Sequence, residues 1–159
     1  MGKIIGIDPA FRKNGMAVAV IDKDSKTVYS EILNGVIDFY KFINSFNSDE
    51  IDLIIIENAH LQNVTFEKKD NSKILARISR NVGMVQAVSA QMVQIAKDLV
   101  GDKRVISVSP KEKGVKIYDK KLFYAYIKAF GLRYVGDRNT QDIRDAIKIA
   151  TIGLTSRFK

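Results

Sequence analysis

Lys3-Ile4-Ile5-Gly6-Ile7-Asp8-Pro9 is the stretch that decides the fold, because an apolar run here ends on a carboxylate. A continuous run of aliphatic residues and glycine predicts a strand that is covered on both faces. Pro9 cannot donate a hydrogen bond to a neighbouring strand, so the strand is expected to end there, with Asp8 at the rim of a sheet. Taken alone, Asp8 also fits a turn residue before proline. Other acids in the chain must decide between these two interpretations.

A second run of the same kind, Ile51-Asp52-Leu53-Ile54-Ile55-Ile56-Glu57, also ends on an acid. The apolar spacing over residues 36–46 predicts a helix just before it. A strand that is reached through a helical crossover usually runs parallel to the strand that it joins. If the two apolar strands are neighbours, Asp8 and Glu57 end at the same rim. On its own, Glu57 also fits a solvated strand end.

The remaining elements complete an α/β pattern. Residues 16–21 and 27–33 alternate as strands and are joined by short turns, so they form an antiparallel meander with the first strand. Further apolar patterns predict a long helix over about residues 74–99, a strand at 104–108, and helices at about 120–130 and 141–155. The whole pattern predicts a mixed five-stranded sheet, with three antiparallel strands followed by parallel strands, flanked by helices.

The composition predicts one soluble domain over residues 1–159. The chain has 159 residues and 46% hydrophobic content, which is enough for a substantial core, and no shift in composition divides it. Cysteine is absent, which excludes disulfides and thiolate metal sites. No apolar run approaches 18 residues and no leader peptide is recognisable, so we expect a cytoplasmic protein without a membrane segment.

A net charge of +8 favours a polyanionic partner, such as a nucleic acid. The basic residues fall into two groups around expected loops, where binding residues tend to lie. The alternative is that these side chains only solvate the surface. The two groups are Lys68, Lys69, Lys73, Arg77 and Arg80, and Lys111, Lys113, Lys116, Lys120 and Lys121.

The last helix carries two more acids. Thr140 is the expected N-cap, and Asp142 and Asp145 stand three residues apart on one side. At about 100° per residue, Asp142 points toward the core and Asp145 lies at the border of the apolar arc. The opposite face, which is expected to be solvated, carries Arg144, Lys148 and Thr151. An exposed Asp142 would fit a simple response to the helix dipole, but an inward one does not.

Inward carboxylates need a cation. Several of them brought together repel one another and tend to protonate unless a metal ion keeps them charged. The chain has one histidine and no cysteine, so the ligands would be oxygens. Oxygen-only sites favour magnesium or manganese.

The acids and their spacing resemble those of RuvC-type Holliday junction resolvases, which belong to the RNase H-like superfamily. The matching parts are Ile5-Gly6-Ile7-Asp8-Pro9, Asn14-Gly15 before the second strand, Ile55-Ile56-Glu57 and Asp142-Ile143-Arg144-Asp145-Ala146. Together they extend from residue 1 to about residue 154. The resemblance implies an RNase H-like fold and a structure-specific endonuclease that resolves four-way and other branched DNA junctions by paired hydrolytic nicks.

The resemblance also implies roles for particular residues. Asp8 would bridge two ions of Mg²⁺ or Mn²⁺, with Glu57 on one side and Asp142 and Asp145 on the other. The two basic groups become candidate DNA contacts, one lysine of the second group becomes a candidate helper at the scissile phosphate, and His60 becomes a candidate DNA contact rather than a metal ligand. A homodimer would form through the long middle helix, from about Ile78 to Leu99.

Some features depart from the cellular enzymes. Ala10 stands where glycine is usual, His60 where an aromatic residue is expected, and Arg80 lies three positions before Gly83 rather than beside it. These differences indicate a phage-type relative, which would act in the host cytoplasm.

Three alternatives stay open. The first is an RNase H-like nuclease on RNA/DNA hybrids, and the second is a non-catalytic protein that binds branched DNA. An ATPase of the actin-like class fits less well, because its later glycine-rich phosphate loops are absent from the sequence.

Overall fold

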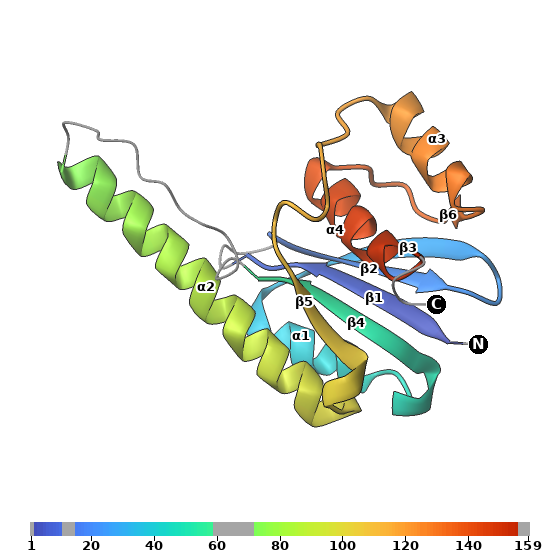
Figure 1. Cartoon of the computed structure of the whole chain (residues 1–159), viewed down its shortest axis with the longest axis horizontal. Helices are drawn as coiled ribbons and strands as arrows, with labels where there is room; N and C mark the ends of the chain where they lie inside the picture. Colours follow the sequence, from blue (N-terminus) through green and yellow to red (C-terminus); the bar gives the residue numbers. More distant parts are fainter. Residues whose placement is uncertain (1, 11–14, 59–71, 156–159) are drawn as a thin grey trace.

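The structure is a computed structural model, and it describes residues 2–10, 15–58 and 72–155. Within the long helix, the side chains of residues 72, 74, 75, 78 and 82 are also outside the description. Figure 1 shows a central sheet with helices on both of its faces.

The sheet has six strands in the order β5-β4-β1-β2-β3-β6. β1, β2 and β3 are antiparallel neighbours, and β4 runs parallel to β1. β5 lies parallel to β4, and β6 lies parallel to β3. The strands are β1 (Lys3–Asp8), β2 (Met16–Asp22), β3 (Thr27–Leu33), β4 (Ile51–Glu57), β5 (Val105–Val108) and β6 (Arg133–Tyr134).

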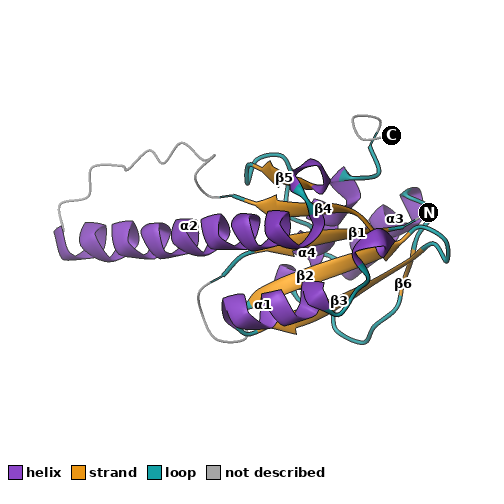
Figure 2. Ribbon diagram, turned by 90° about the horizontal axis from the view of Figure 1, so that it is seen from below, coloured by secondary structure: helices purple, strands orange, loops and turns teal. Residues whose placement is uncertain are grey.

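The two faces of the sheet carry different helices. One face packs against α1 and α2, around a core that includes Ile5, Phe39 and Met92. The other face packs against α4 and α3, around Ile4 and Phe123. Figure 2 shows α1 and α2 together on one side of the strands. The helices are α1 (Gly35–Asn44), α2 (Ser72–Val100), α3 (Lys120–Ala129) and α4 (Gln141–Ile152), with short 3-10 turns at Ser48–Glu50 and Asp102–Arg104.

The mixed α/β sheet predicted from the sequence is confirmed, with one addition. β6 extends it from five strands to six, and this strand has only two residues. Tyr134 packs edge-on against Phe123 of α3, with the ring centroids 5.7 Å apart. A two-residue pairing has no alternation to detect in a sequence, which is why the polar stretch around it predicts no strand.

α2 has two different halves. In its second half, Met92, Ala96 and Val100 are buried against the core. In its first half, every described side chain from Lys73 to Met84 is exposed. Figures 1 and 2 agree that this end of the helix extends beyond the sheet. In the described part of the chain, no helix is both long and apolar enough to cross a membrane.

Candidate active site

Asp8 and Glu57 lie on the same face and at the same end of the sheet. Ile4 belongs to the core under α4, and alternate residues of a strand share a face, so Gly6 and Asp8 also face α4. In β4, Ile55 belongs to that core as well, which puts Glu57 on the same face. β1 and β4 are parallel neighbours that both end on these acids. The expectation of a shared rim is therefore confirmed.

Gly6 lets α4 approach this rim. A Cβ atom at Gly6 would lie 2.3 Å from the backbone nitrogen of Ala150 and 2.7 Å from the carbonyl oxygen of Ala146. Real Cβ atoms do not approach backbone this closely, so any larger residue at position 6 would push the helix away. Two buried alanines of β2 also face α4: Ala17 is paired with Asp8, and Ala19 with Gly6, across the β1–β2 ladder. Small side chains on both elements thus bring the acids of α4 toward β1.

α4 begins where the sequence predicts. Thr140 is the N-cap, and its hydroxyl oxygen accepts a hydrogen bond from the backbone N–H of Ile143 at 3.4 Å. The two acids differ in burial, in the opposite order from the prediction: Asp145 is buried with 4% exposure, whereas Asp142 is only partly buried. The side-chain amide of Gln141 donates to Oδ1 of Asp145 at 2.9 Å. Asp145 therefore has a fixed orientation.

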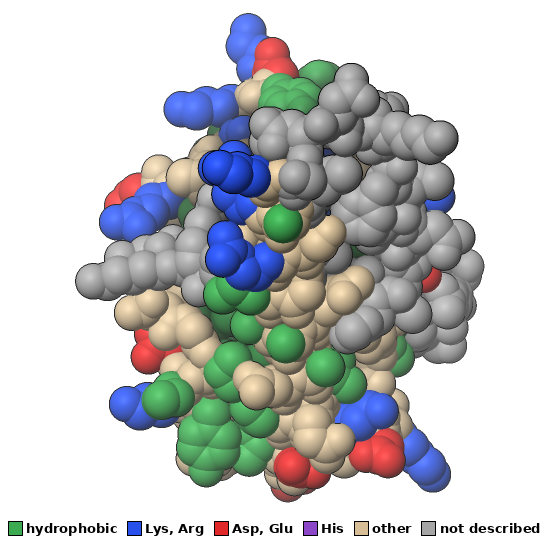
Figure 3. Space-filling view, turned by 90° about the vertical axis from the view of Figure 1, so that its left-hand side faces the viewer, with side chains coloured by type: hydrophobic (Ala, Val, Ile, Leu, Met, Phe, Trp, Pro, Cys, Tyr) green, Lys and Arg blue, Asp and Glu red, His purple; other side chains and the backbone are tan. Residues whose placement is uncertain are grey.

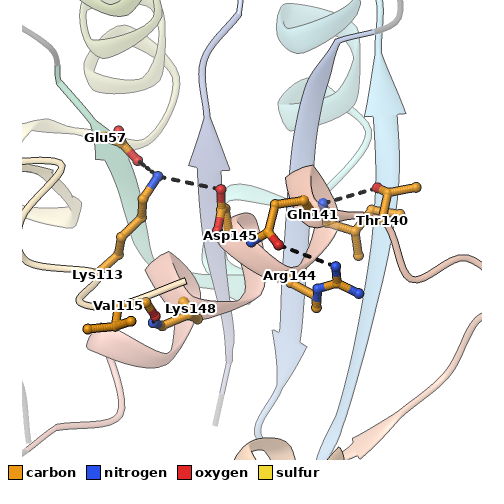
Figure 4. A network of polar contacts seen from close by, with 9 residues as sticks. Glu57, Lys113, Val115, Thr140, Gln141, Arg144, Asp145 and Lys148 are labelled. Carbon is orange, nitrogen blue, oxygen red and sulfur yellow. Dashed lines mark hydrogen bonds and ion pairs between the residues drawn. The ribbon is translucent and has the colours of Figure 1, made fainter. Parts of the chain in front are cut away.

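Lys113 stands between the acids of β4 and α4. Its Nζ donates to Oε2 of Glu57 at 2.8 Å and lies 3.7 Å from Oδ2 of Asp145. Figure 4 shows this ammonium group reaching from its loop to both carboxylates. Burial works against the charged form of Lys113, but the charges of Asp8, Glu57 and Asp145 outweigh it and raise the pKa of the lysine. Lys113 is thus held as a cation in the centre of the site.

Asp8 is the most perturbed acid in this group. Burial raises its pKa, and repulsion from Glu57 raises it further, with smaller contributions from Asp145 and Asp142. Lys113 opposes these effects, and the result is a pKa of about 7 instead of 3.8. To stay fully ionised near neutral pH, a carboxyl group in these surroundings needs more positive charge than one lysine supplies.

The residues present fit a divalent cation in their chemistry. All four candidate ligands are carboxylates, and burial together with repulsion from Glu57 raises the pKa of Asp8, so positive charge at this point would be favourable. Within residues 2–10, 15–58 and 72–155, however, no three metal-binding side chains are already gathered around one point. The arrangement with Lys113 between the carboxylates therefore differs from one in which the carboxylates share an ion.

The outer face of α4 is buried, which corrects the expectation of a solvated face. Arg144, Lys148 and Thr151 have 8%, 6% and 1% exposure. The loop after β5 and α3 cover Lys148 and Thr151: Lys148 donates to the carbonyl of Val115, and the hydroxyls of Tyr126 and Thr151 are 2.7 Å apart. A helical period gives the direction of a side chain, but it does not reveal which other segments lie there.

Arg144 is hydrogen-bonded to residues that are close to it in the sequence. Its guanidinium donates to the backbone carbonyl of Asn139 at 2.8 Å and to the side chain of Gln141 at 3.3 Å. Because Gln141 also donates to Asp145, Arg144 positions the residue that orients this acid. Burial lowers the pKa of Lys148. The nearby charge of Asp145 acts in the opposite direction but is the smaller effect. Gln141, Arg144 and Lys148 were not among the sequence-based candidates.

The candidate DNA contacts fall in three places. His60, Lys68 and Lys69 lie outside the described residues. The first half of α2 presents Lys73, Arg77 and Arg80, and all three are exposed. Figure 3 looks at the end from which α2 projects, and it shows Lys and Arg side chains grouped there. On the loop after β5 and at the start of α3, the exposed lysines are Lys111, Lys116, Lys120 and Lys121, whereas Lys113 turns inward to the acids.

Comparison with known proteins gives a likeness in structure alone. No family model matches the sequence, and no curated protein matches it. Among solved structures, RuvC from T. thermophilus in complex with a Holliday junction substrate is similar, with a TM-score of 0.59 and 14% sequence identity. The match covers 99% of this chain and 96% of that chain. The chain therefore has the RNase H-like fold of RuvC, in agreement with the resemblance of its sequence to RuvC-type resolvases.

Proposed function

We propose that this protein is a DNA endonuclease that resolves four-way junctions, and other branched DNA, by paired hydrolytic nicks that depend on a divalent metal. The observation that carries the proposal is the shared rim of Asp8 and Glu57, with Asp145 joined to Glu57 through Lys113 and the pKa of Asp8 raised to about 7. A protein that only binds phosphates gains nothing from buried carboxylates, because they repel the same anions. The RuvC fold, seen in a structure that contains a Holliday junction, supports the choice of substrate.

The four carboxylates would hold two ions of Mg²⁺ or Mn²⁺. When bound, such ions supply an activated water molecule and stabilise the leaving oxygen of a phosphodiester. The protein fixes the carboxylates that would hold these ions. Asp8 and Glu57 are held by their strands, and Asp145 is oriented by Gln141. In the net hydrolysis, a water oxygen would bond to phosphorus as one phosphorus–oxygen ester bond breaks, and the leaving oxygen would take up a proton.

The basic residues would bind the DNA backbone. The lysines around the loop after β5 lie in the same segment as Lys113, so the DNA that they hold would pass over the acids. The arginines of α2 are displaced from this rim along the projecting helix (Figure 1). Two separate contact regions suit a branched substrate with several arms better than a single duplex. Phosphate contacts of this kind weaken as the salt concentration rises.

A homodimer through α2 would present two such sites to the two equivalent strands of a junction. Met84 supports this assignment, because it is 44% exposed in the half of α2 that leaves the core. Sedimentation at micromolar concentration is expected to show a dimer for the natural chain and a monomer for Met84→Glu. Ile37→Glu on α1 is the matched control, since Ile37 is 71% exposed on another helix. A monomeric natural chain, or equal effects of both substitutions, would contradict the interface.

The decisive experiment compares three labelled substrates with the same arm sequence: a four-way junction, a linear duplex and an RNA/DNA hybrid. Each is incubated with the protein in Mg²⁺, in Mn²⁺ and in EDTA. Symmetric nicks in the junction, only with metal, are expected. Cleavage of the hybrid alone would favour the ribonuclease interpretation, and junction binding without cleavage in either metal would favour a non-catalytic binding protein.

A plasmid with an extruded cruciform tests whether the two nicks are paired. A single nick relaxes the plasmid and the cruciform is reabsorbed, which leaves a nicked circle. Two nicks within the lifetime of one complex instead give a linear product. We expect linear plasmid to form first, and nicked circles alone would refute paired nicking.

A further inference from the structure

We propose that Lys113 is a built-in substitute for the metal: its ammonium group occupies the centre of the acidic site in the metal-free protein and leaves it when divalent cations bind. This inference rests on the proposed function, because it concerns the same four carboxylates. It assigns to one lysine two successive positions, the first against the acids and the second facing outward.

The contacts of Lys113 are those of a cation in a binding site. Lys113 forms ion pairs with Glu57 of β4 and Asp145 of α4, and it interacts electrostatically with Asp8 of β1. Its side chain is only 13% exposed, as is that of Glu57. One ammonium therefore links the three elements that carry the acids. Without it, repulsion among partly buried carboxylates would oppose the close approach of α4 to β1.

The ammonium and a metal ion cannot hold these acids in the same way. Nζ lies 2.8 Å from Glu57 and 3.7 Å from Asp145, so the two carboxylates are kept apart by the width of an ammonium group. Mg²⁺ demands oxygen ligands at about 2.0–2.1 Å. The absence of a compact three-ligand cluster from the described residues agrees with this difference. A divalent cation can gather the carboxylates only if Lys113 withdraws.

The backbone around Lys113 is anchored, so the side chain is the part that moves. Lys148 donates to the carbonyl of Val115 on one side, and the turn before it is closed by a hydrogen bond from Glu112 N–H to the Ser109 carbonyl at 3.0 Å. Gly114 follows with φ of +76°, a conformation that glycine adopts without strain. A long lysine side chain can swing about this fixed point. Once displaced, its charge joins that of the exposed lysines on the same loop, where a phosphate would lie.

The main test measures metal binding directly. The affinity of the full-length protein for Mn²⁺ is determined by calorimetric titration without DNA, for the natural chain and for Lys113→Met. Removing the competing ammonium is expected to tighten Mn²⁺ binding about tenfold or more, which corresponds to about 1.4 kcal/mol. Lys116→Met is the matched control, because it removes the same charge from the same loop at an exposed position. It is expected to change the Mn²⁺ affinity by less than about twofold, since exposed charges are screened.

Thermal unfolding gives the second readout. In EDTA, Lys113→Met is expected to unfold at a lower temperature than the natural chain, because its carboxylates have lost their counter-ion. Saturating Mn²⁺ is expected to remove most of this difference. An equal loss with and without Mn²⁺ would mean that Lys113 keeps its place when metal binds, which overturns the inference. Unchanged or weaker Mn²⁺ affinity in a folded Lys113→Met variant overturns it as well.

If Lys113→Met does not fold, Lys113→Arg keeps the question open to test. Arginine pairs with carboxylates more strongly than lysine does, so it should be harder to displace and should weaken Mn²⁺ binding. Tighter or equal Mn²⁺ binding by this variant would overturn the inference. Cleavage by the natural chain tests the proposed function independently of Lys113. If the natural chain cuts junctions with Mn²⁺ while the lysine variants bind Mn²⁺ as tightly as it does, only the role of Lys113 is wrong.

Discussion

α4 and α2 use charged residues in opposite ways. α4 has nine consecutive buried residues, Ile143 to Thr151, and two of them are basic and one acidic. In α2, the described side chains from Lys73 to Met84 are all exposed. Charges are costly to bury, so those of α4 remain only because each has a partner, and these partners fix their positions. The comparison separates a helix that orients an acid of the candidate site from one whose first half is exposed to solvent.

The largest effect is expected at the rim under α4. Asp8→Asn should reduce junction cleavage by about three orders of magnitude or more, because it removes a central charged group of the site. Junction affinity in EDTA should stay within about threefold, since the proposed phosphate contacts are made by other residues. Cleavage rates and gel-shift titrations of the same preparation measure both. Equal losses of binding and cleavage would mean that Asp8 is structural.

The stability of the metal-free protein should fall as the pH rises. The pKa of Asp8 is about 7 in the folded state and 3.8 when the side chain is free in water, so folding favours the protonated form. The contribution is complete below about pH 4 and is lost as the pH rises through 7. A difference of about three pKa units corresponds to about 4 kcal/mol.

Asp8→Asn isolates this contribution. Urea unfolding in EDTA should give similar free energies for the variant and the natural chain near pH 4, and a variant that is more stable by up to about 4 kcal/mol near pH 8. Asp49→Asn, on the exposed turn before β4, is the control and should show no such trend. A difference between Asp8→Asn and the natural chain that is independent of pH would contradict the burial of this carboxylate.

Two glycine substitutions contrast the helices directly. Gly6→Ala places a methyl group against the backbone of α4 and should cost about 3 kcal/mol of unfolding free energy, as overpacking does. Gly83→Ala on α2 meets nothing within 4 Å in the described structure and should gain about 0.5–1 kcal/mol. Thermal or urea unfolding measures both. A Gly6→Ala variant as stable as the natural chain would show that α4 is not pressed against β1.

The smallest effect on DNA binding and cleavage is expected on the surface of α2. Replacing Arg77 and Arg80 together by Gln should weaken junction binding about tenfold. The slope of log affinity against log salt concentration should become shallower by about two, because each arginine would contribute one phosphate contact. The cleavage rate of bound junction should change little, since these residues are remote from the acids. Lys103→Gln, exposed beyond the other end of α2, is the control. An unchanged salt dependence would exclude α2 from the DNA interface.

The sequence was sufficient for the order of the main elements and for the two strand-end acids, because continuous apolar runs and their ends are local features. It was also sufficient for the N-cap at Thr140. It could not single out Lys113 among five similar lysines, because the loop after β5 has no periodicity that relates it to the sheet. The buried state of Lys148 likewise depends on a segment that is distant in sequence.

Gly6 illustrates the same limit. In the sequence it interrupts an aliphatic run, and only the position of Ala146 and Ala150 explains why a side chain is excluded there. A glycine in a central strand indicates close approach by another backbone. Which backbone approaches is a property of the assembled fold.

The projection of α2 also has a consequence for hydrogen exchange. A helix of 29 residues is about 43 Å long, and its first half lacks the burial that stabilises the second. In a lone chain, backbone amides from Lys73 to Met84 should exchange with solvent far sooner than those near Met92 or in α4. Slow exchange along this half of the helix would reveal a covering partner, and its dependence on protein concentration or on added junction would identify that partner as a second chain or as DNA.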